Sequence, residues 1–129
     1  MKLLLLPLLL AFSLFGADPD WLYDFDEAKA KAAAEGKGIM MIISRVGCPA
    51  CEYMEDVVIP DEEVSAYIGA HFVPLHVDVD ENPIPPGFRA FGTPTFYFLN
   101  ADGKKRGRQM VGAAKKAAFM ERLKAAVSE

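Results

Sequence analysis

The chain has 129 residues, of which 52% are hydrophobic and 25% are charged, with 10 glycines, 9 prolines and 2 cysteines. This composition fits one compact globular domain and excludes collagen-like, disordered and multidomain proteins. The formal net charge of −4 argues against nucleic acid as a partner, because that binding depends on cationic side chains that neutralise phosphates. A domain of this size can bury a core without disulfide bridges, so the two cysteines are free for chemistry.

The first segment has the pattern of a secretory signal peptide. Lys2 is followed by an apolar run over 3–15, and then by small residues and an acidic stretch. This run is too short to cross a membrane, which takes about 20 residues, and the small residues suit a cleavage site. We expect residues 1–17 to be removed and residues 18–129 to form a periplasmic or secreted domain. An uncleaved membrane anchor is the alternative, because a large residue stands third before the cleavage point.

The next elements alternate between helix and strand. The spacing of apolar residues predicts a helix over 21–35 that ends at Gly36. A continuous apolar run over 38–44 predicts a strand that is covered on both faces. A second helix is expected over 49–59, with a proline in its first turn, and a third over 61–70.

The second half of the chain predicts a strand, a long loop, a hairpin and a final helix. The segments are a strand over 72–79, a proline-rich loop over 82–87, a strand over 95–99, a turn over 100–103, a returning strand over 105–111 and an amphipathic helix over 113–127. Strands that alternate with helices and then end in a hairpin and a helix predict an α/β sandwich with a mixed central sheet.

Cys48-Pro49-Ala50-Cys51 stands between the first predicted strand and the helix that follows it. A thiol at a helix N-terminus meets unsatisfied N–H groups and the positive end of the helix dipole, which stabilise the thiolate. The thiolate is the attacking species in disulfide exchange. We therefore predict that Cys48 is the nucleophile and that Cys51, one turn into the helix, is the more buried resolving thiol. This chemistry needs no organic cofactor.

Several short motifs, in their order and spacing, resemble the thioredoxin superfamily over nearly all of the mature chain. The motifs are Cys48-Pro49-Ala50-Cys51, Val77-Asp78-Val79-Asp80, Gly92-Thr93-Pro94-Thr95, Asn100-Ala101-Asp102-Gly103 and Val111-Gly112-Ala113. The residues after Cys51 and the Phe72-Val73-Pro74 segment are similar to exported bacterial thioredoxin-like proteins, including the C-terminal domain of membrane disulfide-reducing transporters. The resemblance implies a thioredoxin-like three-layer sandwich with a mixed central sheet.

The same resemblance implies an exported thiol–disulfide oxidoreductase that reduces disulfides in protein substrates through the Cys-Pro-Ala-Cys site. A membrane or soluble electron-donor protein would recharge it, and we expect a monomer. Pro94 would be a cis-proline that faces the active-site disulfide, since a cis bond has a low cost only before proline. The backbone of Thr93 would then hold a substrate peptide as an added strand. An ordinary trans proline at the strand entrance is the alternative.

Three positions depart from the thioredoxin pattern. Gly47 replaces the tryptophan before the first cysteine, and Ile42 replaces the buried acidic residue that relays protons for the resolving thiol. His76 stands where thioredoxin has a lysine. We hypothesise that His76 lies near Cys51 and assists its proton transfer. A histidine whose hydrogen bonds are satisfied elsewhere in the core is the alternative.

Other functions are compatible with the same cysteines. Cys48, Cys51, His71 and His76 have a superficial likeness to a zinc finger, although the gap between the two pairs is long, and we expect no bound metal. A copper chaperone on this scaffold would use the two thiolates as soft ligands. A thiol oxidase, an isomerase and a non-catalytic module braced by the disulfide are further alternatives. Covalent haem attachment is excluded, because Glu52 stands where that motif requires histidine.

Overall fold

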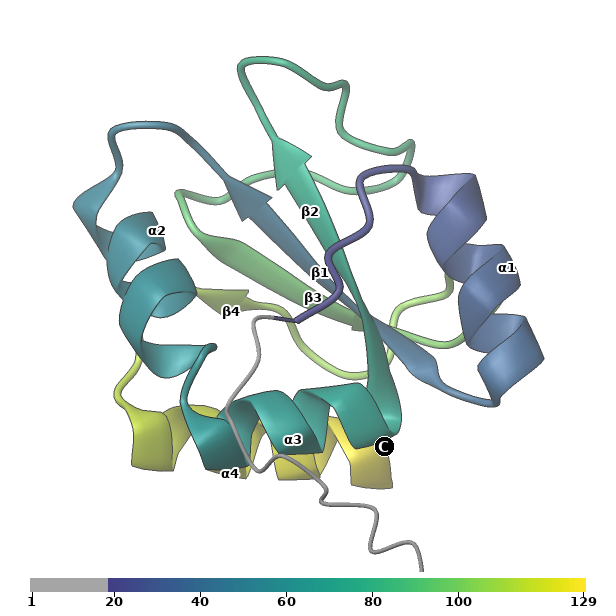
Figure 1. Ribbon diagram of the computed structural model, residues 1–129. Helices are drawn as coiled ribbons and strands as arrows, with labels where there is room; N and C mark the ends of the chain where they lie inside the picture. The colour runs from purple at the N-terminus through teal and green to yellow at the C-terminus, as the bar shows by residue number, and fades with distance from the viewer. Residues whose placement is uncertain (1–18) are drawn as a thin grey trace, which may run out of the picture.

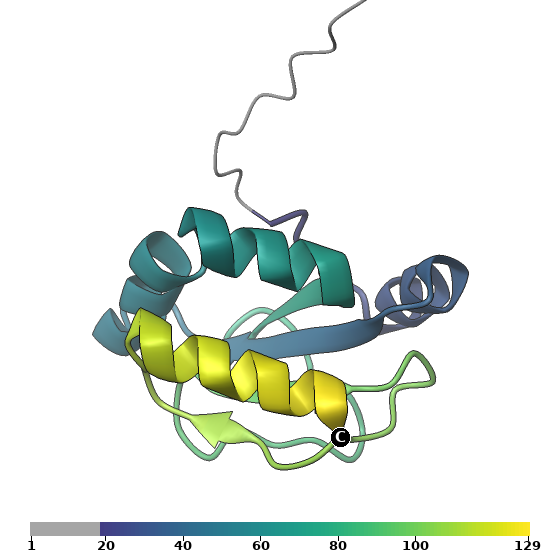
Figure 2. The same ribbon diagram turned by 90° about the horizontal axis from the view of Figure 1, so that it is seen from below.

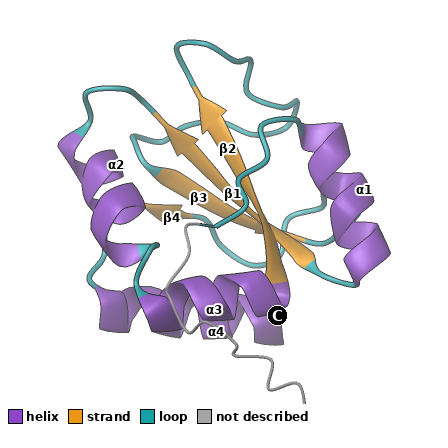
Figure 3. Cartoon of the chain, viewed as in Figure 1, coloured by secondary structure: helices purple, strands orange, loops and turns teal. Residues whose placement is uncertain are grey.

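The computed structural model describes residues 19–129, and the predicted signal peptide over 1–17 lies outside them. The described chain is built around a four-stranded mixed sheet with the strand order β2-β1-β3-β4 (Figures 1 and 3). The central strand β1 (Gly38–Ser44) lies parallel to β2 (Phe72–Asp78) and antiparallel to β3 (Thr95–Leu99). The short edge strand β4 (Met110–Val111) pairs with β3 in antiparallel fashion.

Helices cover both faces of this sheet. They are α1 (Phe25–Glu35), α2 (Pro49–Tyr53), the π-helical turn η1 (Met54–Val58), α3 (Glu62–His71) and α4 (Lys116–Ser128). α1 packs on one face, whereas η1, α3 and α4 bury their apolar side chains against the other. Figure 2 shows α3 and α4 side by side on that second face. The predicted thioredoxin-like three-layer sandwich is therefore confirmed.

β1 runs through the middle of the hydrophobic core, and all seven of its residues are buried. Met40 and Ile42 point to the core under α3 and α4, whereas Ile39, Met41 and Ile43 point to the core under α1. This alternation follows from the two-residue period of a strand. Burial on both faces explains why the segment is apolar until Ser44 at its end, and the prediction made for it is confirmed.

The first helix is shorter than predicted. It begins at Phe25 because Asp24 is its N-cap: the Asp24 carboxylate accepts a hydrogen bond from the Glu27 N–H at 2.8 Å. The preceding residues are extended instead, and Leu22 forms a parallel bridge with Leu75 on the outer edge of β2. The apolar residues at 21 and 22 therefore belong to the sheet edge, and assigning them to the helix was wrong.

The returning strand of the hairpin is also shorter than predicted. Of the segment 105–111, only Met110–Val111 forms a regular strand, together with an isolated bridge between Leu99 and Lys105. Gly107 interrupts the segment, because its φ of +66° lies in the left-handed region and turns the chain away from the sheet.

The second predicted helix does cover 49–59, but its geometry changes midway. After α2 the chain widens into η1, where the Ile59 N–H donates to the Met54 carbonyl at 2.8 Å. Wider turns of this kind occur frequently at functional sites. Within residues 19–129, no helix is both long and apolar enough to cross a membrane.

The N-terminal ends of α3 and α4 are joined by ion pairs. Lys116 Nζ lies 3.2 Å from carboxylate oxygens of both Asp61 and Glu63, and Asp61 also caps α3 through the N–H groups of Glu63 and Val64. Partial desolvation acts to raise the pKa of Asp61, but the Lys116 ammonium and the two N–H donors outweigh it and lower that pKa. Hydrogen bonds to the two carboxylates raise the pKa of Lys116.

Candidate active site

Cys48 and Cys51 form a disulfide, with their Cα atoms 5.2 Å apart. Cys48 is partly exposed, whereas Cys51 has no exposed surface. The order of exposure agrees with the predicted roles of an accessible attacking sulfur and a shielded resolving one. Substrate sulfur can therefore reach Cys48 but not Cys51.

The local chain explains why Cys48 stands at a helix start. β1 ends at Ser44, and Gly47, with a φ of +75°, turns the chain into α2. Pro49 occupies the first turn of α2, where a missing N–H costs nothing. Cys48 is the N-cap, and the Cys51 N–H points to its Sγ at 3.2 Å. Once the disulfide is reduced, this donor favours a thiolate at Cys48.

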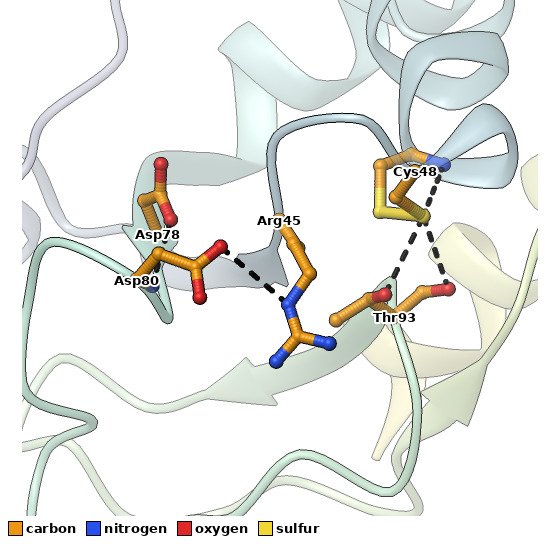
Figure 4. Close-up of polar contacts among 6 residues, drawn as sticks. Arg45, Cys48, Asp78, Asp80 and Thr93 are labelled. Atoms are coloured by element: carbon orange, nitrogen blue, oxygen red, sulfur yellow. Dashed lines mark hydrogen bonds and ion pairs between the residues drawn. A yellow bond between two sulfur atoms is a disulfide. The ribbon is translucent and has the colours of Figure 1, made fainter.

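A second segment reaches Cys48 from the far end of the β2–β3 loop. The Thr93–Pro94 peptide bond is cis, as the resemblance implied. The Sγ of Cys48 lies 3.5 Å from the carbonyl oxygen of Thr93 and 3.4 Å from its Oγ1 (Figure 4). The Gly112 N–H donates to the Pro94 carbonyl at 2.8 Å and ties this segment to the residues after β4. The structure thus brings Cys48, Cys51, Thr93 and Pro94 into one site.

Exposed apolar side chains occur on the three segments that build this site. Val46, two residues before Cys48, is 78% exposed, and Phe91, two residues before Thr93, is 48% exposed. Val111, whose neighbour Gly112 holds the Pro94 carbonyl, is also 48% exposed. We call these three residues the apolar rim.

A charged pair lies near the same turn. The guanidinium of Arg45, on the turn that leads to Cys48, lies 3.5 Å from the carboxylate of Asp80 (Figure 4). Both side chains are more than half exposed, so the pair contributes little to stability. The Arg45–Asp80 pair therefore places charged side chains next to the site, in addition to the apolar rim.

His76 contacts a carboxylate rather than a cysteine. Its Nε2 meets Oε1 of Glu55, and the rings of Trp21 and Tyr23 lie against the imidazole with centroids 5.6 and 5.9 Å away. Glu55 was not identified from the sequence, although its position four residues after Cys51 placed it on the same helix face. The predicted role of His76 beside Cys51 stays a hypothesis that now includes Glu55.

The four residues of the zinc alternative do not converge. His71 ends α3 and packs on Tyr67 with ring centroids 4.4 Å apart. His76 follows it by five positions along extended chain, which amounts to about 16 Å. The two cysteines are joined to each other. Among residues 19–129, no three His, Cys, Asp or Glu side chains are grouped so that they could hold a metal ion.

Comparisons with known proteins agree with this geometry. A family model described as a thioredoxin-like domain matches residues 25–126. The thiol:disulfide interchange protein DsbD of Ralstonia nicotianae is 29% identical over 109 residues, which cover 81% of this chain and 18% of DsbD. The chain therefore spans less than a fifth of the length of that relative.

Solved structures show the same likeness. A thioredoxin from Thermus thermophilus is 32% identical with a TM-score of 0.69, and the match covers 84% of this chain and 86% of that one. The oxidised DsbD C-terminal domain of Neisseria meningitidis, at 18% identity, shares the fold with a TM-score of 0.61 over 77% of this chain and 89% of that domain. The chain therefore belongs to the thioredoxin-like family, and Cys48 and Cys51 form its CXXC pair.

Proposed function

We propose that this protein is an exported reductase of protein disulfides. The observation that carries the proposal is the setting of Cys48: its partly exposed Sγ lies 3.5 Å from the Thr93 carbonyl, beside a cis-proline and in front of the buried Cys51. One sulfur is open to attack a partner, and the free backbone of Thr93 can pair with an extended peptide around the partner's cysteine. The apolar rim supplies contact area for the flanking side chains of that peptide.

The reaction proceeds in two exchanges. The Cys48 thiolate attacks one sulfur of the substrate disulfide, which forms a mixed disulfide and releases the other substrate sulfur as a thiolate. The Cys51 thiolate then attacks Cys48 Sγ, which closes the Cys48–Cys51 disulfide and releases the second substrate thiolate. The substrate gains two electrons and the protein loses two. A membrane or soluble donor protein must return the electrons before the next cycle.

Further observations support the exchange chemistry and the location. The relative DsbD is by name a thiol:disulfide interchange protein, and the matching region is about the size of this domain. The N-terminal sequence has the pattern of a signal peptide, which would bring the protein to a compartment where disulfides persist. Gly47, in place of a large side chain, leaves the entrance to Cys48 open to folded protein substrates.

Reduction of insulin disulfides with dithiothreitol as the electron source tests the proposal. We expect catalytic turnover by the wild type and none by Cys48→Ser. A disulfide that only braces the fold would give no turnover in either protein. Faster oxidation of a reduced protein, or faster reshuffling of a scrambled one, than reduction of insulin would favour the oxidase or isomerase alternative. Tight Cu(I) binding by the reduced protein without insulin turnover would favour the copper chaperone.

A further inference from the structure

A polar cluster lies at the carboxyl end of β1, on the sheet face where η1 packs, and the exchange scheme above does not use it. The carboxylate of Glu55 contacts Nε2 of His76 with one oxygen. Its other oxygen accepts a hydrogen bond from Ser44 Oγ at 3.4 Å. The side chains of His76 and Glu55 are only 20% and 24% exposed. The Glu55 carboxylate and the His76 imidazole are thus held in contact at a position that is partly shielded from water.

Cys51 is the group in this protein that most needs a proton acceptor. Its thiol must ionise before it can attack Cys48, yet Cys51 has no surface exposed to water. Ile42, on the central strand, is apolar and fully buried, so it cannot take the proton. Glu55 follows Cys51 by four residues across the junction of α2 and η1, which is close to one helical turn, so both side chains lie on the same side of the helix.

The Glu55–His76 pair also has a route to bulk solvent. A pocket of about 230 Å³ opens beside it, lined by Ser44, Arg45, Val46, Gly47, Glu52, Glu55, His76 and Asp78. The other charged groups at the pocket have different neighbours or face solvent: Arg45 pairs with Asp80, Asp78 accepts from the Asp80 N–H at 2.9 Å, and Glu52 is exposed. A proton taken up by the pair can leave through this pocket without passing Cys48.

The N-terminal segment holds His76 in place. Leu22 pairs with β2 on both sides of Leu75, and the His76 N–H donates to the Leu22 carbonyl at 2.8 Å. The adjacent rings of Trp21 and Tyr23 lie against the imidazole, Trp21 at an interplanar angle of 86°. These contacts orient the ring so that Nε2 faces Glu55. His76 is therefore a positioning residue that acts through Glu55.

We propose that Glu55 and His76 together accept the proton of Cys51 during resolution of the mixed disulfide. In this step the Cys51 S–H bond breaks, and its proton passes through water to the Glu55 carboxylate, which His76 holds in place. The resulting thiolate attacks Cys48 Sγ, the bond from Cys48 to the substrate sulfur breaks, and the substrate leaves as a thiolate. The proton then passes to solvent through the pocket. The inference rests on the proposed exchange chemistry but not on its direction in the cell.

Stopped-flow reaction of the reduced protein with a substoichiometric amount of Ellman's reagent tests the proposal. The first thiolate released reports attack by Cys48, and the second reports resolution by Cys51. We expect Glu55→Gln to slow the second phase by about 100-fold, within the range for loss of a general base, and His76→Gln to slow it by about 10-fold. The first phase should change by less than about threefold. Glu52→Gln is the matched control, because it removes one negative charge from the same pocket without touching His76.

The pH profile separates proton transfer from a merely structural role. In Glu55→Gln, Cys51 must ionise without help, so the second phase should keep rising with pH beyond about 8.5, the value of a free thiol, because burial disfavours the thiolate. In the wild type the second phase should level off at lower pH. An unchanged rate and profile in Glu55→Gln would overturn the proposal, and so would an equal change in Glu52→Gln. Glu55→Gln keeps an oxygen for Ser44, so it remains informative if His76→Gln fails to fold. Loss of insulin turnover with normal two-phase kinetics would instead count against the proposed reductase function.

Discussion

The hydroxyl of Thr93 should stabilise the reactive thiolate, and Thr93→Val isolates that contribution. Oγ1 lies 3.4 Å from Cys48 Sγ, and valine keeps the β-branched shape and the backbone groups while it removes the donor. Hydrogen bonds to charged groups contribute about 1.5–3 kcal/mol. Because the contact is long and Cys48 is partly exposed, we take the low end, about 1.5 kcal/mol.

This free energy converts into two measurable shifts. The midpoint of the pH profile for alkylation of Cys48 should rise by about one pH unit, since one unit corresponds to about 1.4 kcal/mol. The reduced form loses the same stabilisation where the thiolate is populated, so the reduction potential should become more negative by up to about 30 mV. Rates of iodoacetamide alkylation between pH 5 and 9, with roughly half-unit spacing, resolve a shift of this size.

Thr93→Ser is the matched control for this experiment. Serine keeps the hydroxyl and loses only the methyl group, so its alkylation profile should stay within about 0.3 units of the wild type, well below the shift expected for valine. Equal profiles for wild type, Thr93→Val and Thr93→Ser would refute the reasoning, because the hydroxyl would then make no contribution to the thiolate. Equal upward shifts in both variants would also refute it, because they would assign the effect to the methyl group and to packing.

Three further predictions follow from the site and the helix ends. Cys51→Ser should accumulate a stable mixed disulfide between Cys48 and insulin, visible by non-reducing electrophoresis, and wild-type turnover by this variant would contradict the two-cysteine scheme. Asp24→Ala should lower the free energy of unfolding in urea by about 1 kcal/mol through loss of the α1 cap, whereas Asp24→Asn, which still caps, should cost less. Asp61→Asn keeps the α3 cap but loses the ion pair with Lys116. The fold lowers the pKa of Asp61 from 3.8, so the charged carboxylate stabilises the wild type above pH 3.8. This stabilisation is lost as the pH falls through the pKa that Asp61 has in the folded protein. The difference in unfolding free energy between the wild type and Asp61→Asn should therefore narrow at that acidic pH. A gap that is independent of pH would contradict this.

The parts of the structure that could be predicted depend on local patterns. The apolar run of β1 has one consistent interpretation, a strand buried on both faces, and the structure has that strand. The spacing of Cys48 and Cys51, and their place between a strand and a helix, are local features that predict disulfide exchange. The cis peptide bond before Pro94 was predicted from the family resemblance. No local sequence pattern distinguishes a cis from a trans proline at the start of a strand.

The missed features depend on contacts between distant segments. Trp21 and Leu22 have the spacing of a helix, and only the edge of β2 makes them extended. Asp24 and Glu27, three residues apart, did carry a capping signal for the true helix start. Glu55 on a helix contacts His76 on a strand, 21 residues later in the chain. The spacing of apolar residues does not predict which helix face packs against which end of a strand. The sequence alone therefore does not identify Glu55 as the partner of His76.

The reduction potential of the Cys48–Cys51 pair tests the central claim most directly. The protein is equilibrated in graded thiol–disulfide buffers, and its redox state is read from the gel shift after alkylation. A reductase that draws electrons from a donor protein predicts a potential near that of thioredoxin, about −270 mV. A potential near about −120 mV, typical of a strong oxidant, would contradict the proposed direction of electron flow.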